Sequence, residues 1–109
     1  MYARSSTIMA QPERIDDGVA MVNNKLMSML THIDGCIGIS LLVDRPSGRC
    51  IATTSWHSED AMRASNARLE PVRQRLVETL GGDGVEVQEW EIAMLLHREH
   101  ESWPGRALG

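Results

Sequence analysis

Apolar positions along the chain change period several times, from the spacing of strands to that of helices. Residues 2–10 have modest β-branched content and predict a first strand. Intervals of three and four residues then predict a helix from about Pro12 to about His32. Its apolar face consists of Ile15, Val19, Val22, Leu26, Leu30 and Ile33. The Asp34-Gly35 pair ends this helix, because glycine accepts the left-handed backbone conformation.

The middle of the chain predicts a β-hairpin. Residues 36–43 are mostly apolar, residues 44–48 have the composition of a turn, and residues 49–56 form the second arm. A turn centred near Pro46 puts Val43 opposite Cys50 and Cys36 opposite about His57. The two cysteines are then more than about 20 Å apart along the strands, too far for a disulfide. We expect both to be reduced, small core residues.

A second helix follows the hairpin at once. Ser58 is a suitable N-cap, and Glu59 and Asp60 lie in the first turn, where negative charge is favourable. Pro71 interrupts the apolar stripe and should break or kink the helix near residues 67–70. The Gly81-Gly82-Asp83-Gly84 sequence ends the helix, and residues 85–96 predict a last long strand.

The element order is strand, helix, strand, strand, helix, strand. This order predicts an α+β, ferredoxin-like βαββαβ domain over residues 1–97, with residues 98–109 as a C-terminal tail. The four strands form an antiparallel sheet with both helices on one face. Both sheet faces are apolar, with Ile37, Ile39, Leu41 and Val43 on one side of the second strand. We therefore expect a homodimer that packs sheet against sheet.

Composition restricts the function classes. The 109 residues suit one domain, and 42% apolar content is typical of a globular protein. A net charge of −4 with scattered basic residues argues against nucleic acid as a partner. No apolar run reaches about 18 residues, so no membrane span is expected. The first residues lack a secretory signal pattern, and we expect a cytoplasmic protein.

Residues 53–65 carry a family resemblance. Trp56 ends a strand and is followed by Ser58, two acidic residues and Ala61, and residues 34–38 include a glycine turn before the second strand. This pattern resembles the antibiotic biosynthesis monooxygenase domain family of the dimeric α+β barrel superfamily. The resemblance covers about residues 2–97. It implies a ligand cavity between the sheet and the helices of each subunit.

The resemblance also implies a choice of activities. Some members oxidise polyketide quinols without metal or flavin, others degrade haem, and others isomerise or bind small molecules. The oxygenases tend to have Asn four residues before the tryptophan and Tyr six residues after it, where this chain has Ala52 and Met62. Haem degradation is disfavoured, because residues 58–84 contain no Trp or His and the first strand contains no Asn.

Candidate site residues follow from this implied cavity. Trp56 is either a core anchor or one wall of a pocket, which would also include Met62, Ser65, Asn66 and Met29. Arg73 or Arg75 would stabilise an anion, unless both lie on a solvated helix face. His32 and His57 are the candidate bases, with a helix-end role and a surface role as the alternatives.

No cofactor or metal is expected. His97 and His100 alternate with Glu99 and Glu101, but this spacing at a strand end is poor ligand geometry. The leading hypothesis is a cofactor-independent monooxygenase that acts on a small aromatic or quinol-like substrate. The alternatives are a binding module with a pocket lined by Met21, Met27, Met29 and Met62, or a structural dimer with a filled core.

Overall fold

The computed structural model describes residues 1–96 and contains one antiparallel sheet of four strands. The strands are β1 (Tyr2–Met9), β2 (Cys36–Asp44), β3 (Arg49–Trp56) and β4 (Glu86–Glu91). Their order in the sheet is β2-β3-β1-β4, with β1 paired to both β3 and β4. The predicted ferredoxin-like fold is therefore confirmed, and the edges of the sheet are β2 and β4.

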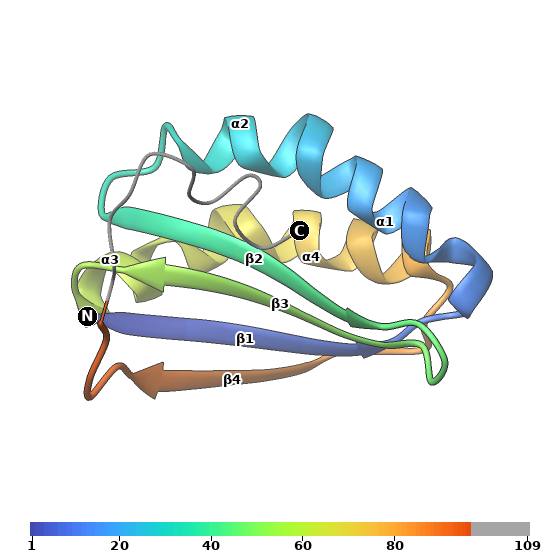
Figure 1. Ribbon diagram of the computed structural model, residues 1–109. Helices are drawn as coiled ribbons and strands as arrows, with labels where there is room; N and C mark the ends of the chain where they lie inside the picture. Colours follow the sequence, from blue (N-terminus) through green and yellow to red (C-terminus); the bar gives the residue numbers. More distant parts are fainter. Residues whose placement is uncertain (97–109) are drawn as a thin grey trace, which may run out of the picture.

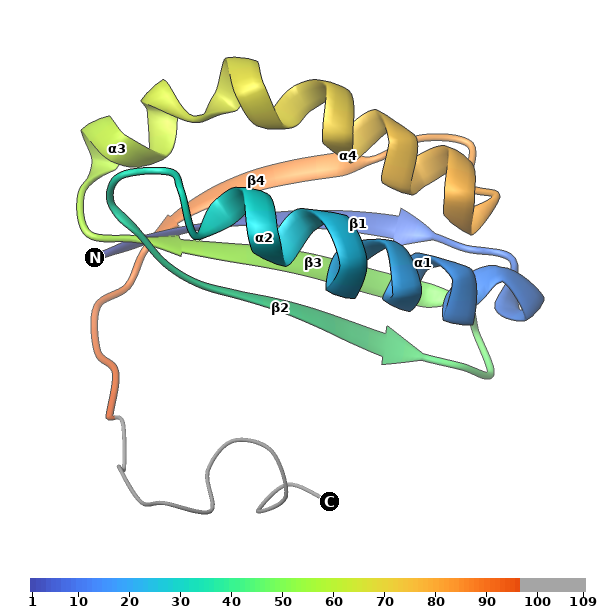
Figure 2. The same cartoon turned by 90° about the horizontal axis from the view of Figure 1, so that it is seen from above.

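Two helical segments lie side by side on one face of this sheet (Figure 1). The first segment begins with a 3₁₀ turn (Pro12–Arg14) and continues through α1 (Ile15–Met21), a π-helical segment (Val22–Leu26) and α2 (Met27–Leu30). The second segment is α3 (Glu59–Ala64) followed by α4 (Asn66–Leu80). Figure 2 shows α4 on the β1–β4 side and α1–α2 on the β2–β3 side. Within residues 1–96, no helix lies on the opposite face of the sheet.

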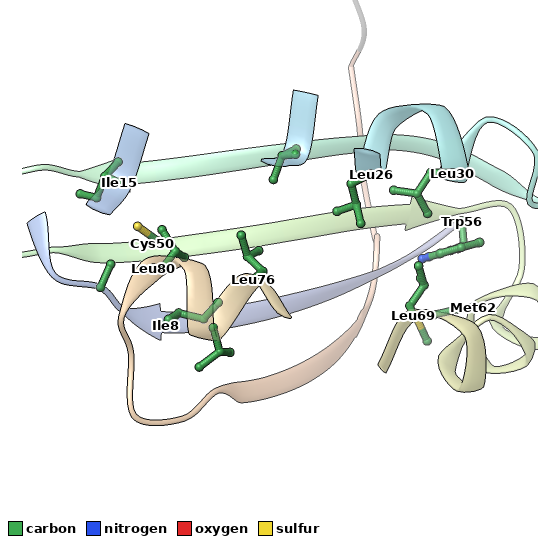
Figure 3. Close-up of a cluster of buried hydrophobic side chains, with 13 residues drawn as sticks. Ile8, Ile15, Leu26, Leu30, Cys50, Trp56, Met62, Leu69, Leu76 and Leu80 are labelled. Atoms are coloured by element: carbon green, nitrogen blue, oxygen red, sulfur yellow. The ribbon is translucent and has the colours of Figure 1, made fainter. Parts of the chain in front are cut away.

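The hydrophobic core lies between the sheet and the two helical segments (Figure 3). Alternate residues of the strands point into it, as expected for the two-residue period of a strand. Trp56 is fully buried and closes one end of the cluster in Figure 3. The other buried apolar residues are Ile8, Ala10, Ile15, Val22, Leu26, Leu30, Cys50, Met62, Leu69, Leu76, Val77 and Leu80.

The second helix breaks earlier than the sequence predicted. Ser58 caps α3 by accepting a hydrogen bond from the Ala61 backbone N–H, as expected. The break, however, lies at Ser65 and not at residues 67–70. Ser65 is buried, and its carbonyl accepts the first bonds of α4, from the backbone N–H groups of Arg68 and Leu69. Pro71 lies inside α4, where it removes one backbone donor without ending the helix.

The hairpin register is confirmed at one end and shifted at the other. Val43 pairs with Cys50 as predicted, whereas Cys36 pairs with Trp56 and not with His57. The cause is a β-bulge between Cys36 and Gly38, which adds one residue to β2. Cys36 consequently packs against the core, and Ile37 is exposed on the other side, contrary to its predicted face. Both cysteines are free thiols.

Strand β4 is shorter than predicted and ends at Glu91 instead of Leu96. Its neighbour in the sheet is β1, whose first residue Tyr2 pairs with Glu91. One further bond joins the Ile92 N–H to the Met1 carbonyl at 2.9 Å, and β1 offers no partner beyond it. Residues 92–96 therefore leave the ladder. The predicted tail, residues 98–109, lies outside the described residues.

Gly18 has a packing role in α1. A Cβ atom at this position would lie 2.4 Å from Leu80 Cδ2 and 3.0 Å from Leu80 Cγ. Leu80 is fully buried at the end of α4, so its side chain has little room to move. The glycine lowers local helix propensity, but it allows α1 to approach α4 closely.

Gly18→Ala should therefore destabilise the protein by about 1 kcal/mol, because overpacking against Leu80 outweighs the gain in helix propensity. Urea unfolding followed by circular dichroism measures the change. Gly84→Ala is the matched control, since no heavy atom lies within 4 Å of a Cβ there, and it should change stability by less than about 0.5 kcal/mol. A stabilised Gly18→Ala variant would contradict the packing role.

Candidate functional site

A largely apolar cavity of about 40 Å³ lies between the sheet and both helical segments. Leu26 and Leu30 form the wall on the α1–α2 side. The sheet supplies Ser6, Ile39, Ala52 and Thr54, and α4 supplies Leu69, Val72 and Leu76. Arg4 and Arg73 add the charged lining groups. A cavity therefore does lie between the sheet and the helices, but it is small, and its lining is apolar apart from two guanidinium groups and a few hydroxyl groups.

The π-helical segment helps to form the apolar wall. Val22, Leu26 and Leu30 are all buried, although they are spaced by four residues each. An α-helix repeats every 3.6 residues, so a strict four-residue spacing drifts around the helix. The wider π turn over residues 22–26 compensates for part of this drift. It thereby keeps Leu26 and Leu30 directed at the cavity.

Arg4 is the most buried charged residue of the site, with 3% of its surface exposed. Its Nη2 donates to the Met62 carbonyl at 2.7 Å and to Glu89 Oε2 at 3.3 Å. Its Nη1 donates to Ser65 Oγ at 3.3 Å, and Ser65 Oγ in turn donates to the Met62 carbonyl at 2.7 Å. The buried Nε of Arg4 has no hydrogen-bond partner among the described residues.

A wider cleft of about 590 Å³ adjoins the cavity and shares Arg4 and Arg73 with it. Its other lining residues are Arg63, Asn66, Val87 and Glu89. The cleft therefore contains three guanidinium groups and one carboxylate, in a chain whose net charge is −4. A local excess of positive charge in a concave site favours anionic ligands.

Arg73 is half-buried at the boundary between cavity and cleft. Its Nη2 donates to Asn66 Oδ1 at 3.2 Å. Burial lowers the pKa of Arg73, and the nearby charge of Arg4 lowers it further, while Glu70 and Glu89 act in the opposite direction. A guanidinium stays protonated at neutral pH, so the site holds two neighbouring cations.

Solved structures with a similar fold include two oxygenases. One is the ActVA-Orf6 monooxygenase of Streptomyces coelicolor in complex with nanaomycin D, with a TM-score of 0.69 and 15% identity over 89% of this chain and 92% of that chain. Another is SnoaB, a cofactor-independent oxygenase of Streptomyces nogalater, with a TM-score of 0.64 and 15% identity over 89% of this chain and 97% of that chain.

The chain has the antibiotic biosynthesis monooxygenase fold. A dimeric ferredoxin-like protein from an uncultured marine organism shares it, with a TM-score of 0.66 and 8% identity over 90% of this chain and 92% of that chain. At such identities the likeness concerns the fold alone. The resemblance noted in residues 53–65 is confirmed at that level.

Sequence relatives are more similar but uncharacterised. The proteins Rv2557 and Rv2558 of Mycobacterium tuberculosis are each 53% identical to the chain over 108 residues, which is 99% of the chain. The chain spans 47% of the length of the first and 45% of the second, about half of each. No protein-family profile matches the chain.

Within this monooxygenase fold, several sequence-predicted residues meet around Arg4. Asn66 and Arg73 line the cleft. Ser65 and Met62 are buried behind it. Arg4 donates to the hydroxyl oxygen of Ser65 and to the backbone carbonyl oxygen of Met62. Trp56 does not line the cavity, but its Nε1 donates to Thr54 Oγ1 at 3.0 Å, and Thr54 does line it.

Other predicted residues lie elsewhere. Arg75 and Met29 line a separate groove between the two helical segments, together with Met21, Lys25, Leu26 and Val72. His32 is exposed at the end of α2, where its Nδ1 lies 2.9 Å from the Ser28 carbonyl oxygen. His57 is exposed directly after β3. The four methionines of the expected Met-lined pocket do not share one cavity, because they lie on different faces of the helices.

Sequence reasoning missed Arg4 and Glu89. Arg4 lies on the inward face of β1 together with Ser6 and Ile8, and Glu89 is its partner residue in the register of β4. The available signal was the alternation in β1, which places an arginine at an inward position of a strand. Buried arginines are rare unless they are paired, so this position could have been chosen as a candidate.

Residues 1–96 contain neither a cluster of metal ligands nor a membrane-spanning helix. No group of three histidine, cysteine or acidic side chains there is arranged to hold a metal ion. None of the helices in this part of the chain is long and apolar enough to cross a membrane. The expected His97 and His100 pair lies outside the described residues.

Both cysteines are predicted to react slowly with alkylating agents. Burial raises the pKa of the Cys50 thiol, which the charge of Arg45 only partly opposes. Burial likewise raises the pKa of Cys36, against a smaller effect of its bond to the Gly38 carbonyl. A raised pKa leaves less thiolate at neutral pH, so the rate should keep rising above pH ~8.5, the ordinary thiol pKa.

Mass spectrometry of iodoacetamide labelling measures this rate at pH 7.5 and above. The native chain should react about tenfold or more slowly than the chain unfolded in urea, and fully buried Cys50 should react after half-buried Cys36. Rapid labelling of Cys50 in the native state would contradict its assignment to the core.

Proposed function

We propose that the chain is a cofactor-independent monooxygenase of small aromatic or quinol-like substrates. The observation that carries the proposal is the apolar cavity that opens, between Arg4 and Arg73, into a cationic cleft. The cavity of about 40 Å³ is smaller than the roughly 150 Å³ that encloses a benzene ring, so the ring would lie mainly in the adjoining cleft with one edge against the aliphatic wall. A ring hydroxyl at the boundary would then face the guanidinium groups. These groups favour the deprotonated hydroxyl, which is the electron-rich form that reacts with oxygen.

The substrate itself supplies the electrons in this reaction. A phenolate transfers an electron to O₂, and the resulting radical pair joins to form a carbon–oxygen bond at the ring. Loss of water from this peroxide leaves a quinone. In balance, a phenol and O₂ give a quinone and water: one oxygen atom becomes the new carbonyl, and the other leaves as water with the hydroxyl hydrogen and one ring hydrogen of the substrate. The protein then needs to position the ring, exclude water and stabilise the anion.

Arg73 is the proposed anion stabiliser, because it lines both the cavity and the cleft, whereas Arg75 lines neither. His32 and His57 also lie outside both. With no imidazole of residues 1–96 at the cavity, the proton of the substrate would pass to the water of the open cleft. The acidity of the substrate, increased by Arg4 and Arg73, takes the place of a strong base.

A second candidate function is binding without catalysis. Ala52 lines the cavity at the position where the oxygenases that the sequence resembles tend to have Asn. Met62, where they tend to have Tyr, is buried and offers the site only its backbone carbonyl. The site thus has fewer hydrogen-bonding side chains than the oxygenase pattern, which favours a module that holds a flat ligand unchanged.

Oxygen uptake with a panel of hydroxyanthrones and hydroquinones tests the oxygenase. Arg73→Met should reduce kcat about 100-fold, the usual effect of losing one donor to a developing anion. Arg75→Met is the matched control and should retain uptake, because Arg75 is exposed and outside the cavity. Equal loss in both variants would contradict the assignment of Arg73.

The same panel separates the two candidate functions. An oxygenase consumes O₂ and forms a quinone that absorbs visible light. A binding module shows saturable changes in tryptophan fluorescence without uptake. Absence of both signals across the panel would contradict the proposal that the cavity receives an aromatic ligand.

We also propose that two copies of the chain associate through the face of the sheet that carries no helix. Leu42 and Trp90 lie on this face with 56% and 51% of their surfaces exposed. The register of the strands places small uncharged side chains between them, namely Ser5, Thr7, Ser40, Thr53 and Ser55. A broad face without charge at its centre suits burial against a second copy. The dimeric ferredoxin-like structural neighbour supports the association of two copies.

Leu42→Glu should convert this dimer into a monomer, because it would bury an unpaired carboxylate at the sheet interface. Light scattering coupled to size exclusion should give twice 12.1 kDa for the unmodified chain and 12.1 kDa for the variant. Met27→Glu makes the same chemical change at an exposed helical position and should leave the dimer intact. A monomeric unmodified chain at micromolar concentration would contradict the proposal.

A further inference from the structure

Among the described residues that line the cleft, Glu89 is the one carboxylate, and its contacts with the arginines are long. Its Oε2 lies 3.3 Å from Arg4 Nη2, and its Oε1 lies 4.0 Å from Arg63 Nε. Well-formed pairs of this kind are about 2.7–2.9 Å long. Arg63 has a closer partner in Glu59, at 2.9 Å. The side chain of Glu89 is 40% exposed, so water can replace the protein as its partner.

Arg4, in contrast, is fixed and incompletely satisfied. Backbone and hydroxyl oxygens behind the cleft hold its guanidinium in place, at Met62 and Ser65. Its buried Nε has no partner in the part of the chain that the structure describes. A fixed, planar guanidinium whose Nη2 holds Glu89 only at 3.3 Å is suited to a second carboxylate at that donor, because charge-assisted pairs of arginine and carboxylate are strong.

The charge balance of the cleft points in the same direction. Arg4 and Arg73 both line the cavity and the cleft, and Glu89 contacts the first of them directly. One more negative charge between the two arginines would relieve their mutual repulsion. The apolar wall next to them offers the place for a ring.

We propose that the cleft binds an aromatic carboxylic acid, whose carboxylate takes the place of Glu89 on Arg4 and bridges to Arg73. The ring of this ligand lies against the aliphatic wall, so the inference rests on the proposed function in using the same cavity. Glu89 is then an internal counter-ion of the empty site. It satisfies Arg4 when no ligand is bound, and its negative charge opposes the entry of an acid until it turns to solvent.

The test measures binding and not oxygen uptake. Isothermal titration calorimetry at pH 7.5 and low salt compares 1-naphthoic acid with 1-naphthalenemethanol and 1-naphthol on the full chain. These three probes share one ring system and differ in the polar group. The acid should bind about tenfold or more tightly than the alcohol, because a charge-assisted pair with arginine is stronger than a neutral hydrogen bond.

Glu89→Gln is the decisive variant. It keeps the shape of the side chain and removes the competing charge, so affinity for the acid should rise about fivefold while affinity for the alcohol stays unchanged. Glu91→Gln is the matched control, two residues further along β4 on the same side of the strand, and it removes the same charge without contacting Arg4. It should change affinity less than twofold. Arg73→Met should abolish the preference for the acid.

Several outcomes would overturn the inference. Equal affinity for acid and alcohol would show that the arginines do not select a carboxylate. Tighter binding of the naphthol than of the acid would assign the site to a phenolate. Equal gains in Glu89→Gln and Glu91→Gln would reduce the effect to net charge, and no binding of the acid at millimolar concentration would remove the ligand class.

Failure of the oxygenase proposal is distinguishable from failure of this inference. Selective binding of the acid without oxygen uptake by any quinol would leave the carboxylate site intact and remove the catalytic proposal. Oxygen uptake with quinols that lack a carboxylate, together with no preference for the acid, would leave the oxygenase and overturn the assignment of Glu89.

Discussion

The structure depends on one buried guanidinium. Arg4 projects from β1, the strand that pairs with both β3 and β4, and it binds the Met62 carbonyl, Ser65 Oγ and Glu89. These contacts tie the sheet to the end of α3, to the start of α4 and to β4. A buried cation is costly unless it is well paired, so the break between α3 and α4 has to lie where Met62 and Ser65 can reach Arg4. The cleft beside it is a consequence of this arrangement.

Most of the fold was predictable from sequence because it depends on local signals. The predicted hairpin arm at residues 49–56, the Ser58 cap and the turn between β2 and β3 agree with the hydrogen bonds and pairings of the structure. The departures come from tertiary contacts. The end of β4 is set by where β1 begins, and the bulge at Ile37 is set by the fit of β2 to β3. Neither leaves a pattern in its own segment.

The candidate site was less predictable than the fold, because its residues are distant in sequence. The family resemblance directed attention to Trp56 and the helix after it, and Ser65, Asn66 and Arg73 do lie at or behind the cleft. Arg4 and Glu89 are separated by 85 residues and meet through strand pairing alone. The alternation in β1 marks position 4 as inward, but it does not identify the partner of the arginine. Glu89 is identified only once the sheet order is known.

The Arg4 guanidinium contributes both to the packing of the fold and to the proposed selection of a ligand. The oxygens of Met62 and Ser65 stabilise Arg4 from behind, and this support is what keeps the guanidinium at the cleft instead of in solvent. If the support were complete, Arg4 would have no donor left for a ligand. It is weak at Glu89, a residue that lines the cleft, so the Nη2 donor that holds Glu89 remains available for a ligand there. Trp56 has a parallel role, because the buried ring fixes the Thr54 hydroxyl at the cavity without lining it. The core residues therefore act on the site through the polar groups that they position.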